Sequence, residues 1–474
     1  MATFDPPLDR NEEQEPSSRD LEAADAESIT TSDTQGGHLE TYGAEKTYMN
    51  GPGLENLDHD PVTRSTTKSS WKDPGPPPDG GLVAWTQVIM GHLVVFNTWG
   101  YISSFGVFQS YYAEALSHPP SDISWVGSVQ IFLLFFVGTF SGRATDAGYF
   151  HQTFLAGSIL VVLGIFMTSL ATEYWQLFLA QGVCTGLGNG LVFCPSLSLL
   201  STYFSKHRSL AIGIAASGSA TGGLVYPAMV QQLLPRIGFP WTIRAVGFVA
   251  LGTMAVANVF SRTRLPPRKT GPLVEWSAFR EASYSFFSVG MFLTFWGLYF
   301  AFYYIGPYGR DIIGLTREDS ISLLLVMNGV GLVGRLVPNY AADRWLGPLN
   351  TLVPFIFATA FLVYCWIAVS AHGGLFAFAA VYGIFAAGIQ SLFPATVSSL
   401  TTDLRKAGVR MGMIFSIVSF ACLTGPPIAG ALIQRGQGTY LYAQLFSGSV
   451  MMAGCCILVA ARIAKTGLVW KQRT

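Results

Sequence analysis

The chain has 474 residues, of which 50% are hydrophobic and only 12% are charged, about half the charged fraction of an ordinary soluble protein. The net charge of zero hides a division, because residues 1–79 have a net charge of −11 and the remaining residues one of +11. A soluble globule could not hide so much apolar surface, and the basic residues form no patch with interleaved aromatic residues of the kind that nucleic-acid-binding proteins use.

Residues 1–79 are predicted to form a disordered acidic tail. The segment 1–71 is rich in Glu, Asp, Ser, Thr and Gly, and the proline-rich run 74–78 follows it. Such a segment buries too little apolar surface to offset the entropy of the chain. It contains no apolar stretch that could serve as the core of a signal peptide, so we expect the tail to be retained in the cytoplasm.

Apolar windows of about 20 residues recur after Gly81, each long enough for a helix to cross a hydrocarbon core of about 30 Å. The longest polar interruption, 262–284, divides them into two sets of six. We therefore predict an all-α integral membrane protein with twelve transmembrane helices, arranged as an N-terminal bundle (80–261), a cytoplasmic central loop (262–284), a C-terminal bundle (285–462) and a cytoplasmic tail (463–474). The predicted spans are 84–108, 123–141, 152–171, 174–200, 210–233, 241–261, 285–305, 319–341, 350–370, 374–400, 410–433 and 440–462.

Lys and Arg favour short cytoplasmic loops. With the N-terminus inside, 13 basic residues fall on the cytoplasmic loops and their edges and 4 on the outer loops, and another 4 follow the last span. We therefore expect a multi-pass protein, assigned to the plasma membrane, with both termini in the cytoplasm. The two halves also match at an offset of 199 residues, which pairs Gly213 with Gly412 and Pro227 with Pro426. Such a duplication is typical of transporters with a binding site between two repeats.

Polar and aromatic side chains form stripes at helical spacing on several spans. Polar groups that face lipid are costly, so we expect these stripes to face inward. Arg335 lies about 12 Å along its helix from the loop at Asp343, where it could bind a carboxylate through two hydrogen bonds or pin the helix end to neighbouring carbonyls. For the others, cavity lining and interhelical packing or hydrogen bonding are both open. The candidate substrate-binding residues are Asn97, Tyr101, Ser104, Asn189, Phe193, Trp296, Tyr299, Tyr303, Asn328, Arg335 and Gln390.

Other chemistries find little support in the sequence. No nucleophile and base pair, metal-ligand spacing or phosphate-binding loop is visible, so we expect no enzyme activity and no cofactor or metal. No acidic residue lies in the middle of a predicted span, and His92 is the one histidine candidate for a buried position, where we expect it to pack between helices. A proton-coupled carrier usually has a titratable group in its pathway. Protons stay a candidate coupling ion, and uniport and proton movement on the substrate itself are both open.

Several motifs resemble those of a known family. Segments 142–148 (GRATDAG) and 339–347 (NYAADRWLG) are similar to the two copies of the major facilitator loop motif. Segments 79–85 (DGGLVAW) and 203–213 (YFSKHRSLAIG) resemble the two signatures of the monocarboxylate porter family, and segments 104–112 and 123–128 resemble its fungal branch. The motif residues to which the resemblance gives a gating or topology role are Asp79, Gly80, Gly81, Trp85, Gly142, Arg143, Asp146, Lys206, Arg208, Asp343 and Arg344.

The resemblance implies two six-helix bundles that rock about a central substrate site, often with proton coupling. Members of the family that carry lactate-like acids have a lysine late in the first span and an aspartate one turn before the arginine of the eighth. Here these places hold Ser103 and Gly331, although Arg335 is retained. We therefore predict a secondary transporter of a small organic solute, with an organic anion such as a monocarboxylate as first candidate. Efflux of a bulky fungal secondary metabolite is the alternative, and a membrane sensor that does not transport is a third reading.

Overall fold

The structure is a computed structural model that describes residues 75–116, 120–268 and 272–467. The predicted disordered tail up to residue 74 and the last seven residues lie outside this part. Every regular element in the described part of the chain is a helix. This confirms the predicted all-α class.

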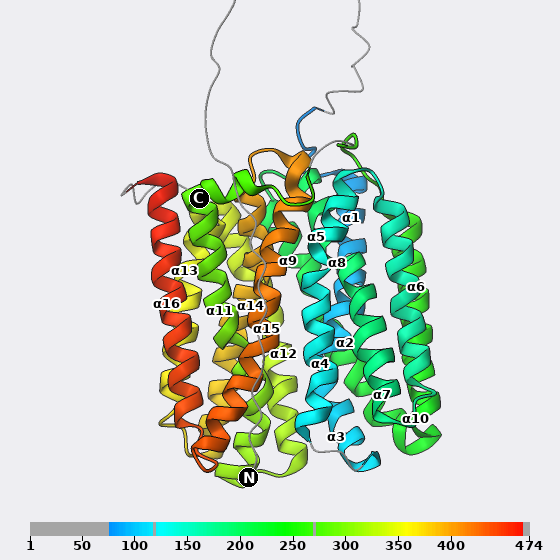
Figure 1. The fold of residues 1–474 in the computed structure, drawn as a ribbon, viewed down its shortest axis with the longest axis vertical. Coiled ribbons are helices and arrows are strands. Elements are labelled where there is room, and N and C mark those ends of the chain that lie inside the picture. The colour runs from blue at the N-terminus through cyan, green and yellow to red at the C-terminus, as the bar shows by residue number, and fades with distance from the viewer. Residues whose placement is uncertain (1–74, 117–119, 269–271, 468–474) are drawn as a thin grey trace, which may run out of the picture. The chain divides into compact units, whose positions relative to one another are not determined.

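Several short helices follow one another without a loop in the N-terminal half, so that one membrane span contains more than one element (Figure 1). The elements are α1 (Gly81–Val95), η1 (Phe96–Gly100), α2 (Tyr101–Ser103), α3 (Phe105–Ala115), α4 (Pro120–Phe136), α5 (Gly138–Asp146), α6 (Phe150–Thr168), α7 (Tyr174–Leu177), η2 (Phe178–Cys184), α8 (Thr185–Tyr203), α9 (Arg208–Ala216) and α10 (Gly218–Phe260).

The C-terminal half has the same character, and it begins after a linker that contains one short helix. Its elements are η3 (Trp276–Arg280), α11 (Ala282–Tyr308), η4 (Gly309–Ile313), α12 (Arg317–Ala341), η5 (Ala342–Leu346), α13 (Pro348–Trp366), α14 (His372–Leu400), η6 (Leu404–Lys406), α15 (Ala407–Arg435) and α16 (Leu441–Thr466).

The described residues form 11 helices long and apolar enough to cross a membrane, against the twelve predicted. The difference lies in the segment Arg208–Phe260, which is continuous over 53 residues and spans two predicted helices, 210–233 and 241–261. Gly238 interrupts its helical geometry with a φ of 71°, a left-handed conformation that glycine adopts without steric cost. Both ends of the segment lie near the start of the linker, so the chain reverses at this glycine without a separate loop.

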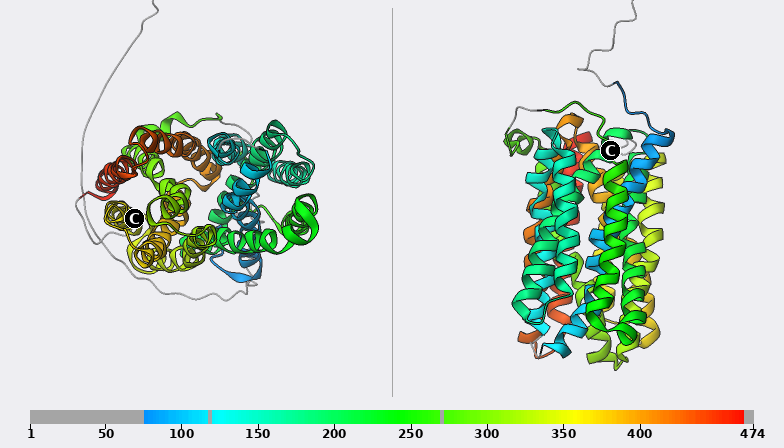
Figure 2. Two further views of the ribbon diagram at one scale, coloured as in Figure 1. Left: turned by 90° about the horizontal axis from the view of Figure 1, so that it is seen from below. Right: turned by 90° about the vertical axis from the view of Figure 1, so that its right-hand side faces the viewer.

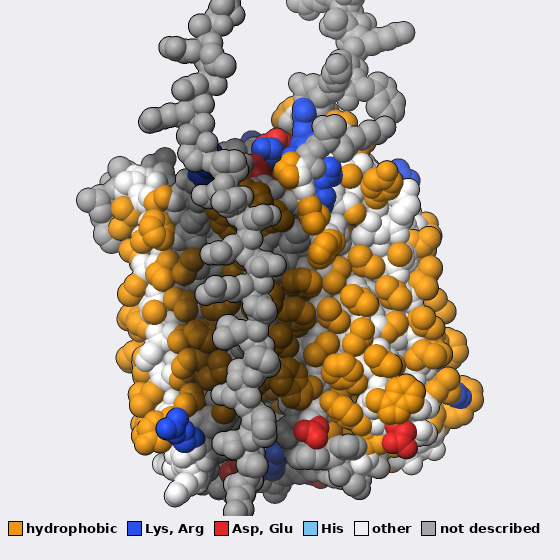
Figure 3. Space-filling model, viewed as in Figure 1, with side chains coloured by type: hydrophobic (Ala, Val, Ile, Leu, Met, Phe, Trp, Pro, Cys, Tyr) orange, Lys and Arg blue, Asp and Glu red, His pale blue; other side chains and the backbone are white. Residues whose placement is uncertain are grey.

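The start of α1, the described parts of the linker (261–268 and 272–281) and the end of α16 lie at one end of the molecule, which we call the linker end (Figure 1). The predicted topology requires this arrangement, because it places both termini and the central loop on the same side of the membrane. Between the ends, the flank in Figure 3 is covered by hydrophobic side chains, and the charged side chains on it lie toward the two ends. Large apolar residues such as Phe248, Leu251 and Phe361 are exposed on the molecule, as expected of a protein whose sides face lipid.

Helices α1–α10 and α11–α16 form two groups that face each other (Figure 2). The groups meet along two seams. At one, α4 and α5 pack against α15, and at the other, α9 and α10 pack against α12 and α14. The space enclosed between these seams contains the candidate site.

Candidate substrate-binding cavity and gate

A cavity of about 300 Å³ lies between the two bundles. Arg335 and Ser320 both line it and are fifteen residues apart in α12, so it extends about 22 Å along that helix. Its closed end, the floor, contains Arg335, Gln390, Tyr299 and Trp99. Its other end, the mouth, contains the exposed Arg310, and there the cavity opens away from the linker end.

The two walls of the cavity differ in chemistry. The described lining residues of the N-terminal bundle form an almost entirely apolar wall. Among them, only Trp99 and Ser103 have polar side-chain atoms. The C-terminal bundle presents hydroxyl, amide and guanidinium groups among its apolar side chains. The N-terminal wall consists of Trp99, Ile102, Ser103, Phe105, Gly106, Val107, Gly127, Ile131, Gly223 and Pro227. The polar members of the C-terminal wall are Tyr299, Tyr303, Arg310, Ser320, Asn328, Arg335 and Gln390.

Arg335 is a buried cation with spare hydrogen-bonding capacity. Arg335 is only 4% exposed, and its Nη2 donates a hydrogen bond to Gln390 Oε1 at 3.1 Å. Its Nη1 has no hydrogen-bond partner in the described part of the chain, and neither has the Tyr299 hydroxyl. Gly331, one turn away, makes room for Nη1, because a Cβ atom there would lie 2.5 Å from it.

No Asp or Glu is among the described residues that line the cavity. A buried charge without a counterion is costly, because its hydration is lost and no ion pair compensates the loss. An anion that reaches the floor would supply the missing partner and could accept two hydrogen bonds from the guanidinium. The floor is therefore suited to a carboxylate or a similar anion.

An aromatic layer closes the cavity toward the linker end. Trp99 stacks on Tyr299 across the two bundles, with ring centroids 6.1 Å apart and planes within 8°. Beyond them, phenylalanines from both bundles pack on one another, with centroids 5.2 Å apart for Phe135 and Phe415 and 5.5 Å apart for Phe193 and Phe415. A chamber of only about 30 Å³ remains among them. The phenylalanines of this aromatic layer are Phe135, Phe193, Phe295, Phe393 and Phe415.

Beyond the aromatic layer, two aspartates connect the bundles reciprocally. Asp146, at the end of α5, accepts hydrogen bonds from the backbone N–H groups of Gly408 (3.1 Å) and Val409 (2.9 Å), in the first turn of α15. Asp343, after α12, accepts hydrogen bonds from the corresponding groups of the first turn of α9, at 3.0 and 2.7 Å. The positive end of a helix dipole favours a carboxylate. Each bundle therefore binds a helix end of the other.

Glycines bring the backbones of α5 and α15 into direct contact at the same seam. A Cβ atom on Gly142 would overlap the carbonyl group of Gly408, and one on Gly412 would overlap that of Gly138. Thr139 and Ser416 add a hydrogen bond of 2.7 Å between their hydroxyl groups. These contacts and the two aspartates form the linker-end seal, so the cavity is open at one end of the molecule and closed at the other.

Comparisons with known proteins agree with this geometry. Residues 89–371 match the sequence model of the Major Facilitator Superfamily. An MFS-type transporter of Gibberella zeae is 51% identical over 400 residues, which cover 84% of this chain and 90% of that protein. The chain belongs to the major facilitator superfamily.

Two further proteins place this transporter among its relatives. The aspyridones efflux protein of Emericella nidulans is 36% identical over 391 residues, 82% of this chain and 79% of that protein. Among solved structures, the human organic anion transporter TETRAN has the same fold, with a TM-score of 0.63 and 15% identity over 79% of this chain and 98% of that one. The transporter is thus a multi-pass membrane protein whose family moves small molecules, and its fold is that of a transporter rather than an enzyme.

Five of the candidate residues line the cavity of this transporter: Tyr299, Tyr303, Asn328, Arg335 and Gln390. Phe193 lies in the aromatic layer. The remaining candidates lie outside the lining. Trp296 donates to Thr424 Oγ1 at 3.0 Å, Ser104 donates to the carbonyl of its own helix, and Tyr101 and Asn189 are fully buried inside the N-terminal bundle.

Asn97 illustrates the interhelical alternative. Its side chain donates to Thr253 Oγ1 at 2.9 Å and accepts from the Tyr226 hydroxyl at 2.7 Å, so it connects three helices rather than facing the cavity. His92 has a similar place, since its Nδ1 lies 2.9 Å from the Ile214 carbonyl oxygen and its Nε2 lies 3.1 Å from Thr221 Oγ1. Both residues hold the first span against α9 and α10.

The face of the first span that lines the cavity differs from its polar stripe for a local reason. The stripe Asn97, Tyr101 and Ser104 assumes 3.6 residues per turn, but Phe96–Gly100 forms a π-helical turn with a wider spacing. After it, Ile102, Ser103 and Gly106 face the cavity, together with Trp99 within the turn. Trp99 and the phenylalanines of the aromatic layer other than Phe193 were not predicted, because five different helices contribute these phenylalanines and no spacing within one helix marks such a layer.

The motif residues lie at the linker end. Asp79 has a φ of 53° and accepts hydrogen bonds from the backbone N–H groups of Ser205 and Lys206. Arg208 donates to the Ser398 carbonyl of the other bundle at 3.0 Å, and Arg143 donates to a linker carbonyl. Lys206 and Arg344 are exposed. Gly80 precedes α1 and Gly81 is its first residue. Trp85 packs on Phe204, with ring centroids 5.2 Å apart. Among these motif residues, all of which the structure describes, Gly142, Asp146, Arg208 and Asp343 contact the opposite bundle.

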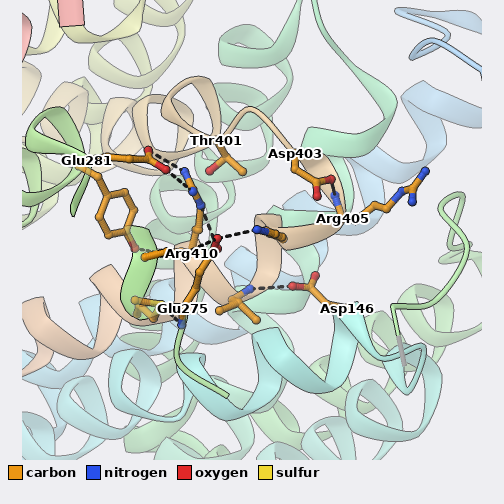
Figure 4. A network of polar contacts seen from close by, with 12 residues as sticks. Asp146, Glu275, Glu281, Thr401, Asp403, Arg405 and Arg410 are labelled. Carbon is orange, nitrogen blue, oxygen red and sulfur yellow. Dashed lines mark hydrogen bonds and ion pairs between the residues drawn. The ribbon is translucent and has the colours of Figure 1, made fainter. Parts of the chain in front are cut away.

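An ionic clip attaches the linker to α15, beside Asp146 (Figure 4). Arg410 donates to Glu275 Oε2 at 3.1 Å and to Glu281 Oε2 at 3.0 Å, and Lys406 Nζ lies 2.6 Å from Glu275 Oε1. Burial alone would raise the pKa of Glu275, but the hydrogen bonds from Arg410 and Lys406 outweigh burial and hold its pKa below the ordinary value. The clip therefore contributes most to stability when Glu275 is ionised.

We expect Glu275→Gln and Arg410→Gln each to destabilise the protein by about 1.5–3 kcal/mol, because each removes a charged hydrogen bond from the clip, while Arg410 keeps Glu281 and Glu275 keeps Lys406 as a partner. The double variant should lose much less than the sum. Since the Glu275 pKa is depressed, the contribution should be complete above about pH 4.5, its ordinary value, and disappear as the pH falls through the folded-state pKa. Thermal unfolding of the purified protein at several pH values measures this. Arg280→Gln, which changes an exposed linker arginine, is the control, and equal melting temperatures for all variants would contradict the clip.

Proposed function

We propose that this transporter exports a bulky organic acid, with a carboxylate or similar anion at one end and an aromatic or otherwise apolar body. The observation that carries the proposal is Arg335, a buried cation without an acidic partner at the closed end of an apolar cavity. The anion would bind the guanidinium, and the apolar body would lie against the wall of the N-terminal bundle.

The size of the cavity favours a bulky acid over a lactate-sized one. Sites of about 300–1,000 Å³ are typical for ligands of drug size, and this cavity has about 300 Å³. A lactate-sized acid at Arg335 could not reach both walls, and most of the apolar lining would stay in contact with water. Gly331 supports the same choice, because the aspartate of lactate carriers is missing there.

Direction and mechanism are part of the proposal. The excess of Lys and Arg on the loops of the linker end supports a cytoplasmic location for that end, and the name of the Emericella nidulans relative supports efflux. The cavity that opens away from the linker end would then be the state that releases substrate outside the cell, and opening of the linker-end seal would load it from the cytoplasm. We place the protein in the plasma membrane and in the fungal branch of the monocarboxylate porters, with protons as the candidate coupling ion.

Transport into inside-out vesicles tests this function. Vesicles from yeast that produces the protein would be supplied with labelled biphenyl-4-carboxylate, its neutral carboxamide or lactate, with and without a pH gradient. We expect the biphenyl acid to accumulate above vesicles without the protein, and the amide and lactate not to do so. The proposal would be overturned by equal accumulation of the amide, by preference for lactate, or by no flux of any of the three compounds. Absence of flux would favour a membrane sensor.

A further inference from the structure

The geometry points to a second anion-binding site at the mouth of the cavity, formed by Arg310, to which the organic acid passes when it leaves Arg335. This inference rests on the proposed function, since it takes the substrate to be an acid. It concerns the release step, which the floor of the cavity does not explain.

Arg310 and Arg335 are the two charged side chains among the described residues that line the cavity. They lie at opposite ends of it. Tyr299, on the floor beside Arg335, precedes Arg310 by eleven residues along α11 and the first turn of η4, a rise of about 16 Å. Arg335 is buried and Arg310 is exposed.

The Arg310 guanidinium is available to a ligand. It has no hydrogen-bond or ion-pair partner among the residues that the structure describes. The neighbouring carboxylate, Asp311, accepts a hydrogen bond of 2.9 Å from the Tyr440 hydroxyl. Asp311 therefore contacts the start of α16, where Tyr440 is the N-cap residue. Arg310 is among the described lining residues and Asp311 is not.

Release needs such a site for an electrostatic reason. Attraction between opposite charges is strong where water is excluded, so an anion bound at Arg335 would leave slowly if no favourable position followed. Passage through a pore requires that each site bind weakly enough, or lie close enough to a further site, for the ion to move on. An exposed guanidinium binds an anion more weakly than a buried one does, and salt screens the attraction between the two charges. Arg310 has the properties of the weaker, later site.

Polar side chains of the C-terminal wall lie between Arg335 and Arg310, along the path that the acid would take to the mouth. Tyr303 lies one turn beyond Tyr299 in α11, and Asn328 and Ser320 lie between Arg335 and the mouth in α12. All three belong to the C-terminal bundle. The charged group of the acid could therefore move along this wall while the apolar body stays on the opposite one.

The test compares Arg310→Gln with Arg435→Gln in the inside-out vesicles, whose lumen corresponds to the mouth. Arg435 is an exposed arginine at the end of α15, on the same end of the molecule, and is not among the lining residues. The control therefore removes the same charge from the same face outside the cavity. Labelled biphenyl-4-carboxylate is supplied outside, and the unlabelled acid is loaded inside at several concentrations and two salt concentrations.

We expect Arg310→Gln to need about two- to fivefold more lumenal acid for half-inhibition of transport, a change that corresponds to one lost charge contact of an exposed cation. The KM on the outer, cytoplasmic side of the vesicle should not change, and high salt should reduce the difference from wild type. Arg310→Lys should behave nearly as wild type does.

The inference is overturned if Arg310→Gln and Arg435→Gln give the same lumenal half-inhibition, or if Arg310→Gln changes the outer KM as much as the lumenal one. In both cases wild type still transports the acid, so the proposed function survives. Failure of wild type to transport the acid at all contradicts the proposed function instead, and the two failures are thereby distinguished.

Discussion

Replacement of Arg335 by Gln is expected to lower the export of an aromatic acid by about 100-fold, which corresponds to the loss of a buried, hydrogen-bonded charge contact. The protein should nevertheless reach the membrane and be at least as stable as wild type. Arg335 is buried without an acidic partner, so its removal also removes the cost of dehydrating a charge. Loss of transport with an unchanged or higher melting temperature separates binding from a structural role.

Two more variants sharpen this expectation. Arg335→Lys keeps the charge but loses the planar pair of donors, so we expect only partial recovery of transport. Gly331→Asp would place a carboxylate beside the guanidinium, which must shift because a Cβ atom at residue 331 would lie 2.5 Å from Nη1. It should compete with the substrate for Arg335 and lower export with the arginine still present. Vesicle transport and thermal unfolding measure both effects, and unchanged export by Arg335→Gln would exclude the anchor role.

Gly412→Leu is expected to hold the linker-end seal open and to reduce transport to below about a tenth. A side chain at this position would overlap the backbone of Gly138 in α5, which cannot move without separating the bundles. Overpacking of this kind costs about 1–3 kcal/mol, enough to shift an equilibrium between two states by about 5- to 150-fold. The variant should therefore favour the conformation in which the linker end is open.

Cys194 provides a native reporter of that opening. It is completely buried, with Sγ 3.9 Å from the Gly408 carbonyl oxygen in the seal. In protein whose other five cysteines are replaced by serine, a membrane-impermeant maleimide should label Cys194 from the linker end in Gly412→Leu and not in wild type. Gly252→Leu is the control, because nothing lies within 4 Å of a Cβ atom at that lipid-facing glycine. Protection of Cys194 in Gly412→Leu, or normal transport by it, would contradict the proposed gate.

The fold was predictable because hydrophobic length and loop charge are local properties of the sequence. Helices such as α13 and α16 fall almost where the apolar windows place them. The apolar windows predict a break between 210–233 and 241–261, whereas the structure reverses there through one glycine, Gly238. That difference depends on a backbone conformation that composition does not specify.

The candidate site was only partly predictable. A buried arginine and asparagine seven residues apart identify one face of α12, and Arg335 and Asn328 do line the cavity. Asn97 shows the limit of such reasoning, since an amide in an apolar span satisfies itself equally well against Thr253 and Tyr226. Arg310 is one of the four basic residues on the predicted outer loops, but the sequence does not predict its place at the mouth, which follows from how η4 continues α11 beside the cavity.

The most direct test of the central claim, that the cavity binds an organic anion at Arg335, is equilibrium binding of one pair of probes to purified protein. Biphenyl-4-carboxylate and biphenyl-4-carboxamide have nearly the same size and apolar surface and differ in charge. Calorimetric titration should give at least about tenfold tighter binding of the acid by wild type, and similar weak binding of both by Arg335→Gln. Equal affinity of wild type for acid and amide, or undiminished acid binding by Arg335→Gln, would contradict the claim.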